Sequence, residues 1–175
     1  IDELAEFSKK FSFGLPTRVD IPNELSGIMP NRKWKKLNKG ESWQRGETLN
    51  TVIGQGFMLA TPLQISLMTA MIASGKIVRP KIQNKKQEYF DHLDVSESSL
   101  KFIREAMYSV VNEYKGTAFS SRLASKYRLV GKTGTSQVRK ITMSERESGV
   151  LKNEEIAYKL RDHSIFTGFA PYKNP

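Results

Sequence analysis

Residues 130–137, with the sequence VGKTGTSQ, constrain the fold and function of this chain more than any other stretch. They follow a short apolar lead-in and predict an exposed strand along a cleft. A glycine inside a strand weakens it and often marks a close approach by a ligand or another backbone, which makes Gly134 informative. Thr133 and Thr135 are two residues apart and share a face. With Lys132 as a point charge, we expect that face to offer one ammonium and two hydroxyls, a suitable grip for a carboxylate.

The spacing around this strand separates two kinds of site. A phosphate-binding P-loop needs a glycine five residues before Gly131, but Lys126 stands there. Nucleotide binding is therefore disfavoured. Because a three-residue motif such as Lys-Thr-Gly also recurs by chance, an edge strand with a solvated lysine remains an open alternative at this point.

Length and composition set further bounds. With 175 residues, 38% of them hydrophobic, the chain is long enough for one domain with a core. No apolar run approaches membrane-spanning length. The sequence has no cysteine and only two histidines, His92 and His163. Neither a thiolate nor a multi-histidine metal site is expected, and we predict no cofactor.

The net charge of +10 is concentrated in two basic clusters. The first comprises Arg32, Lys33, Lys35, Lys36 and Lys39, and the second comprises Lys76, Arg79, Lys81, Lys85 and Lys86. Without these ten residues, the 18 remaining basic side chains balance the 18 acidic ones. A solvated basic face is the favoured interpretation. Binding of nucleic acid or of an anionic membrane surface is the alternative.

The beginning of the chain predicts one helix and then irregular structure. Asp2 can cap a helix that ends near Gly14, with apolar residues on one stripe. Three prolines divide residues 15–46 into turns and short extended pieces.

A loop at residues 51–60, built around the sequence GQG at 54–56, leads into a strong helix signal at 61–74. Thr61 and Gln64 form a capping box, and apolar side chains cover nearly every face of this helix, which predicts that it is buried. The loop could approach a substrate groove, but a tight connection into the helix is the favoured interpretation.

The remaining elements alternate between periodic and irregular segments. They are an extended basic segment at 76–90, a helix at 97–113, a strand at 127–137, a charged excursion at 138–162 with a short helix at 154–160, and a strand at 164–170. The excursion then joins two neighbouring antiparallel strands.

In this order, several stretches resemble the transpeptidase domains of penicillin-binding proteins, whose third signature is Lys-Thr-Gly. The stretches are Ile53 to Gly56 leading into Ala60 to Gln64, Gly116 to Ala118, Gly131 to Gln137, Leu160 to His163, and Phe169 to Tyr172. Residues 29–35 and the charged loop before Arg161 favour the subclass of the rod-elongation machinery. The resemblance spans nearly the whole chain.

The resemblance implies an α/β fold, a fragment of the architecture shared by penicillin-binding proteins and serine β-lactamases. One transpeptidase domain would comprise a mainly helical subdomain at about 1–118 and strands of an antiparallel sheet at 119–175, with the charged loop at 138–162. It also implies a periplasmic domain, an inner-membrane anchor outside this chain, and a membrane glycan polymerase and other elongation-complex proteins as partners. Stem peptides of peptidoglycan and β-lactams would be ligands, and nucleic acid would not.

The implied chemistry is acyl transfer through an acyl-serine. A serine attacks the D-Ala-D-Ala amide of a stem peptide, releases the last D-Ala, and passes the acyl group to an amine of a neighbouring stem. Carried over by the motif, Lys132 provides positive potential and helps to relay a proton. The hydroxyls of Thr133 and Thr135 hold the terminal carboxylate, the N–H of Thr135 is an oxyanion donor, and Gly134 lets the donor peptide lie against the strand.

The family's serine motif, Ser-x-x-Lys, and its second motif, Ser-x-Asn, are expected upstream of this chain, and its last strands downstream. Residues 98–101 (SSLK) mimic the first motif but open a helix after the GQG region, and residues 172–174 (YKN) imitate the second downstream of Lys132. We expect the chain alone to be inactive. His163 is expected to be a hydrogen-bonded structural residue. A non-catalytic β-lactam sensor or scaffold, and a nucleic-acid-binding module, are the alternatives.

Overall fold

A computed structural model describes residues 1–83, 91–123, 126–139 and 141–175. The helices are α1 (Asp2–Lys9), α2 (Arg32–Lys39), α3 (Arg45–Val52), α4 (Pro62–Ser74), α5 (Glu97–Asn112) and α6 (Met143–Ser148). The strands are β1 (Val130–Ser136) and β2 (His163–Phe169), and short 3-10 turns lie at Phe119–Ser121, Asn153–Glu155 and Tyr158–Leu160.

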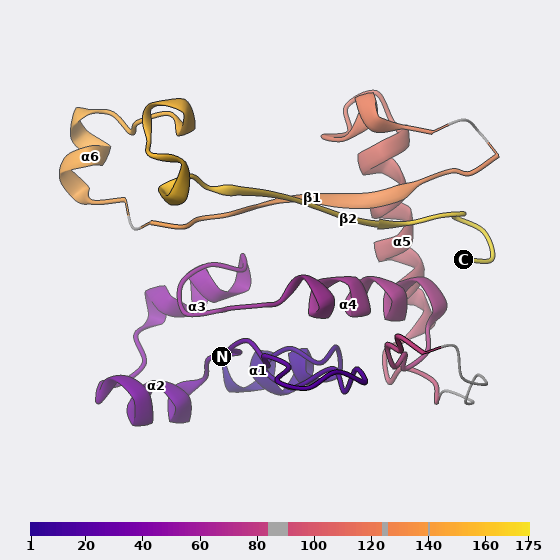
Figure 1. Ribbon diagram of the computed structural model, residues 1–175, viewed down its shortest axis with the longest axis horizontal. Coiled ribbons are helices and arrows are strands. Elements are labelled where there is room, and N and C mark those ends of the chain that lie inside the picture. Colours follow the sequence, from indigo (N-terminus) through magenta and orange to yellow (C-terminus); the bar gives the residue numbers. More distant parts are fainter. Residues whose placement is uncertain (84–90, 124–125, 140) are drawn as a thin grey trace.

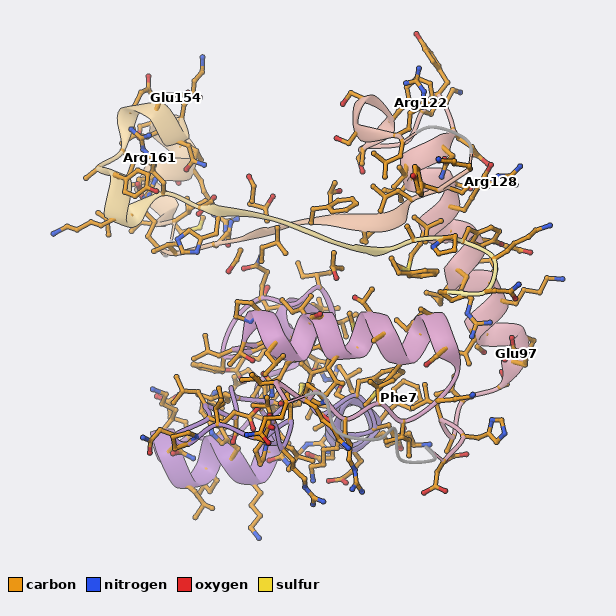
Figure 2. The ribbon with its side chains drawn as sticks, turned by 45° about the vertical axis from the view of Figure 1, so that its right-hand side comes forward. Phe7, Glu97, Arg122, Arg128, Glu154 and Arg161 are labelled. Atoms are coloured by element: carbon orange, nitrogen blue, oxygen red, sulfur yellow. The ribbon has the colours of Figure 1, made fainter. Side chains whose placement is uncertain are left out.

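The two strands form a long antiparallel ribbon above α4, while α1 and α2 lie below that helix (Figure 1). Helix α5 runs past one end of the ribbon and packs against β1. The excursion between the strands makes a lobe at the other end, where Figure 2 places Glu154 and Arg161 together. The side chain of Arg161 holds this lobe by donating from Nε to the carbonyl oxygen of Ile156 at 2.9 Å.

Helix α4 is the structural centre, as its sequence predicts. Thr61 caps it with the predicted box, and Gly75 ends it in the left-handed conformation with φ 70°, which glycine adopts without a steric penalty. Leu67 and Met71 pack on one side against the start of α5, and Ile65 packs on the other side against the cluster formed by the N-terminal segment. The helix therefore joins two apolar clusters.

Gln64 ties the N-terminal segment to α4 through buried hydrogen bonds. Its side chain is fully buried, and its Nε2 lies 2.8, 2.9 and 2.8 Å from the carbonyl oxygens of Ser12, Leu15 and Ser26. Since Nε2 carries two hydrogens, the three carbonyls share them. Its Oε1 accepts from the N–H of Thr61 at 2.9 Å. One side chain thus satisfies backbone groups from three segments.

Lys35, which the sequence analysis places in the first basic cluster, is buried and paired rather than solvated. Its exposed fraction is 1%, and its Nζ lies 2.6 Å from Glu47 and 3.4 Å from Glu41. It also donates to the carbonyl oxygen of Ser42 at 2.9 Å. Burial of a cation requires such partners. Lys35 therefore adds no exposed charge to the basic cluster. Its ion pair with Glu47 joins α2 to α3.

The prediction for the first half was wrong in three places. Helix α1 ends at Lys9 rather than near Gly14, because the chain turns at Ser12 with φ 66° and buries Phe13 under α4. Residues 15–46 are not all irregular, since α2 lies within them. Helix α3 covers positions expected partly as irregular structure and partly as loop.

The second half follows the prediction more closely. Helix α5 and both strands lie within one to three residues of their expected bounds. The expected helix at 154–160 is two 3-10 turns, and α6 was not predicted. Of the extended segment at 76–90, Lys76 forms a bridge with His92, while residues 84–90, with Lys85 and Lys86, lie outside the described residues. Every described helix is too short or too polar to cross a bilayer.

Replacement of Gln64 tests its role as the link between segments. Gln64→Leu keeps the volume roughly but leaves three buried carbonyls and the N–H of Thr61 without this partner. We expect the free energy of unfolding to fall by about 2–4 kcal/mol, because unsatisfied buried groups cost about 1–3 kcal/mol each and partial relaxation recovers some of it. Urea unfolding checks this, and an unchanged midpoint would contradict it.

The Lys35–Glu47 pair predicts an acid-sensitive step in stability. The hydrogen bond from the N–H of Gln44, and then Lys35, hold the pKa of Glu47 below its ordinary value of 4.5. A depressed pKa in the folded state stabilises the protein above pH 4.5, and this stabilisation is lost as the pH falls through the folded pKa. Glu47→Gln should flatten the decline in unfolding midpoint below pH 4.5, whereas an equally steep decline in the variant would argue against the pair.

Candidate functional site

The candidate site lies on the edge of β1 that faces away from β2. No other described strand pairs with this edge. The carbonyl oxygen of Thr135 points to it, because that oxygen accepts a hydrogen bond from Nε2 of Gln55 at 3.3 Å. The N–H and C=O of one strand residue point to the same side, and every second residue shares that side. Thr133 and Thr135 therefore present their backbone groups at the open edge.

Lys132 brings its ammonium to this same edge. The exposed Nζ lies 2.7 Å from the carbonyl oxygen of Thr133. The expectation that Lys132 shares a face with the two threonines was wrong, because neighbouring side chains in a strand alternate. Its cross-strand partner Thr167 meets the hydroxyl of Thr69 in α4 at 2.6 Å. Lys132 therefore leaves the strand on the α4 side and curls back to the edge.

The two threonine hydroxyls have different surroundings. The hydroxyl of Thr133 lies 2.9 Å from that of Thr117, which belongs to the Gly-Thr-Ala stretch after α5. Thr135 is exposed, and its hydroxyl makes no hydrogen bond within the described residues. The structure thus joins two stretches, Gly116 to Ala118 and the strand, that the sequence places only in order.

The two glycines of the motif differ in how closely other atoms surround them. A Cβ built on Gly131 would lie 2.4 Å from the ring of Phe166 and 2.6 Å from the carbonyl oxygen of Thr167. A Cβ on Gly134 would meet only Ile165, at 4.0 Å. Gly131 is therefore needed for the packing of the two strands. Nothing in the described chain fills the space at Gly134.

The GQG loop belongs to the site as well as to the connection into α4. Gly54 and Gly56 have φ values of 74° and 78°, a left-handed conformation that favours glycine. Between them, the N–H of Gln55 donates to the carbonyl oxygen of Asn50 at 2.9 Å, and its side chain reaches Thr135. Sequence reasoning favoured a connecting role alone. The paired glycines around a polar residue were the signal for more.

A cavity of about 760 Å³ opens beside this contact. Gln55, Gly56 and Phe57 line it from the loop, and Val138 and Arg139 line it from the chain after β1. Arg139 is held by an ion pair with Glu145 in α6. A hydrogen bond from the N–H of Thr142, and then Arg139, lower the pKa of Glu145 to about 2.

The other residues weighed from sequence lie away from this edge. Ser96 caps α5 by accepting from the N–H of Ser99 at 3.2 Å, so the serines of 98–101 occupy an ordinary first helical turn. Tyr172 packs its ring on Tyr108 of α5, with centroids 5.1 Å apart. The side chain of His163 is exposed and makes no hydrogen bond within the described part of the chain, contrary to expectation, while its backbone belongs to β2 opposite Ser136. The described residues hold no cluster of three metal-ligating side chains.

An antiparallel strand with an open edge, an ammonium at that edge and a helix packed beneath agrees with the transpeptidase domain that the sequence resembles. Residues 1–175 match the family described as "Penicillin binding protein transpeptidase domain". The chain belongs to this family.

Its relatives point to one subclass. The chain is 32% identical over 188 residues to the peptidoglycan D,D-transpeptidase MrdA of Salmonella typhimurium and 34% identical over 188 residues to that of Haemophilus influenzae. These alignments cover 100% of this chain but 30% and 28% of the relatives. The chain thus spans less than a third of their length.

Solved structures agree with the fold. Penicillin-binding protein 2 of Helicobacter pylori, in complex with MreC, has a TM-score of 0.85 and 36% identity over 99% of this chain and 30% of its own. Penicillin-binding protein 2 of Pseudomonas aeruginosa, in complex with WCK 5153, has a TM-score of 0.77 and 33% identity over 100% of this chain and 37% of its own. These likenesses confirm the predicted fragment of the transpeptidase fold, helices with a two-stranded antiparallel sheet.

The two motif glycines provide a matched pair of substitutions. Gly131→Ala should lower the free energy of unfolding by about 1–3 kcal/mol, because the new methyl group overlaps Phe166 and a strand carbonyl. Gly134→Ala should change it by less than about 1 kcal/mol, since its space is open. Thermal unfolding of both variants checks this. Equal losses would show that the two spaces do not differ.

Proposed function

We propose that this chain is part of a peptidoglycan D,D-transpeptidase of the elongation type. The observation that carries the proposal is the open edge of β1, where the ammonium of Lys132 and the backbone of Thr135 lie together in a chain of the transpeptidase family. The reaction is acyl transfer from a D-Ala-D-Ala stem peptide through an acyl-serine. The serine and Ser-x-Asn motifs belong to a segment outside these 175 residues, so this chain alone is inactive.

Each site residue then has a physical role. The positive charge of Lys132 favours the serine alkoxide and helps to relay its proton. The N–H of Thr135, which shares the open edge with its carbonyl, donates to the oxyanion. The exposed hydroxyl of Thr135 and that of Thr133 bind the terminal carboxylate. The empty space at Gly134 admits the peptide or a β-lactam close to the strand.

The rest of the proposal concerns the whole protein. Residues 1–118 serve as the helical subdomain and 119–175 as the sheet part of one domain. The protein is anchored in the inner membrane with this domain in the periplasm, and it is a target of β-lactam antibiotics. Its partners are a membrane glycan polymerase and elongation-complex proteins, a class supported by the MreC complex of the Helicobacter pylori relative. Burial of Lys35 in ion pairs weighs against the nucleic-acid alternative.

Covalent labelling by a fluorescent penicillin tests the function. A longer form of the protein that includes the Ser-x-x-Lys segment should be labelled, and Lys132→Ala should slow labelling by about 10²-fold or more, the cost of removing one electrostatic group from such a site. Lys101→Ala is the matched control, because this exposed lysine lies on α5 in the false motif. It should label at the wild-type rate.

Two outcomes would count against the proposal. A folded longer protein that is not labelled would point to a scaffold rather than an enzyme. Undiminished labelling of Lys132→Ala would remove the catalytic role of this strand.

A further inference from the structure

Two side chains of the protein occupy the outward carbonyl oxygens on the unpaired edge of β1. The carbonyl oxygen of Thr133 accepts from the ammonium of Lys132 at 2.7 Å, and that of Thr135 accepts from the amide of Gln55 at 3.3 Å. These carbonyls are the acceptors that an extended peptide would use when it adds to a strand edge. A ligand with a suitably placed N–H must therefore compete with Gln55.

The contact made by Gln55 is suited to displacement. Its length of 3.3 Å is at the weak end of the hydrogen-bond range, and it lies in an exposed position. The loop does not depend on it, because backbone bonds from Gln55 to Asn50, at 2.9 Å, and from Gly54 to Thr51, at 3.0 Å, fix the turn. The cavity of about 760 Å³ that Gln55 lines gives the released side chain room.

We propose that Gln55 is a positioning residue that holds the place of the substrate amide. In the free protein its side chain satisfies the carbonyl of Thr135. When a peptide binds along β1, the peptide N–H takes this acceptor, and the amide of Gln55 moves into the cavity. This inference rests on the proposed function, because it requires an acyl donor at the same edge.

Competition makes a selective prediction. A β-lactam with an acylamino N–H must displace Gln55, whereas one without that N–H need not. Removal of the Gln55 amide should therefore strengthen binding of the first kind alone. A merely structural role would instead weaken both kinds together, through a disordered loop.

The experiment compares benzylpenicillin, which carries the acylamino group, with penicillanic acid, which lacks it. Acylation of the longer protein is measured against concentration, by competition with fluorescent penicillin, for wild type, Gln55→Ala and Gln55→Met. Gln55→Met keeps the length of the side chain without the donor. The control is Asn50→Ala, since Asn50 is an exposed amide that lines the same cavity.

For both Gln55 variants, we expect the apparent dissociation constant for benzylpenicillin to fall about two- to tenfold, the range for one net hydrogen bond. The maximal acylation rate should stay unchanged, and penicillanic acid should respond equally to all proteins. No change for either compound, or an equal change for both, would overturn the inference while leaving the transpeptidase intact. Failure of the wild type to react with either compound would instead reject the proposed function.

Discussion

The structure depends on hydrogen bonds to buried backbone carbonyl oxygens, which are costly to leave without donors. The N-terminal segment turns sharply under α4, and three of its carbonyls point inward at one place. Gln64 satisfies them from the first turn of a helix that is mostly apolar. A second polar contact, between the hydroxyls of Thr69 and Thr167, joins α4 to β2. Helix α4 therefore positions the strands as well as the N-terminal segment.

The site follows from an edge that the sheet leaves unpaired. Exposed strand edges invite pairing with other chains, and proteins usually blunt them with charge or cover. Here both devices are present, since Lys132 and Gln55 occupy successive outward carbonyls. Two side chains, rather than another described strand, therefore occupy these carbonyl oxygens. Under the proposed function, an extended ligand would replace the contact made by Gln55.

Local signals were enough to predict α4, α5 and the strand pair. Within α4, the capping box, the left-handed glycine at the end and the apolar side chains all predict the same helix, and tertiary packing does not change it. Elsewhere the local signals did not agree. Helix α2 is mostly charged and was obscured by neighbouring prolines, although Asn31 caps it and Gly40 ends it. Helix α6 was obscured by the charged excursion, although Thr142 and Glu145 form a capping box there.

The site was predicted less completely, because its essential geometry belongs to the backbone. Thr133 and Thr135 supply outward N–H and C=O groups that any residue would supply, so only register and pairing reveal which edge they face. In the proposed function, side chains then add charge and hydroxyl groups to this backbone edge. Gly134 leaves the edge uncrowded, and Gln55 arrives from a loop some eighty positions earlier in the sequence. The spacing of residues along the sequence cannot predict such a contact. The contact depends on the fold, which places the turn at Gly54 to Gly56 next to β1.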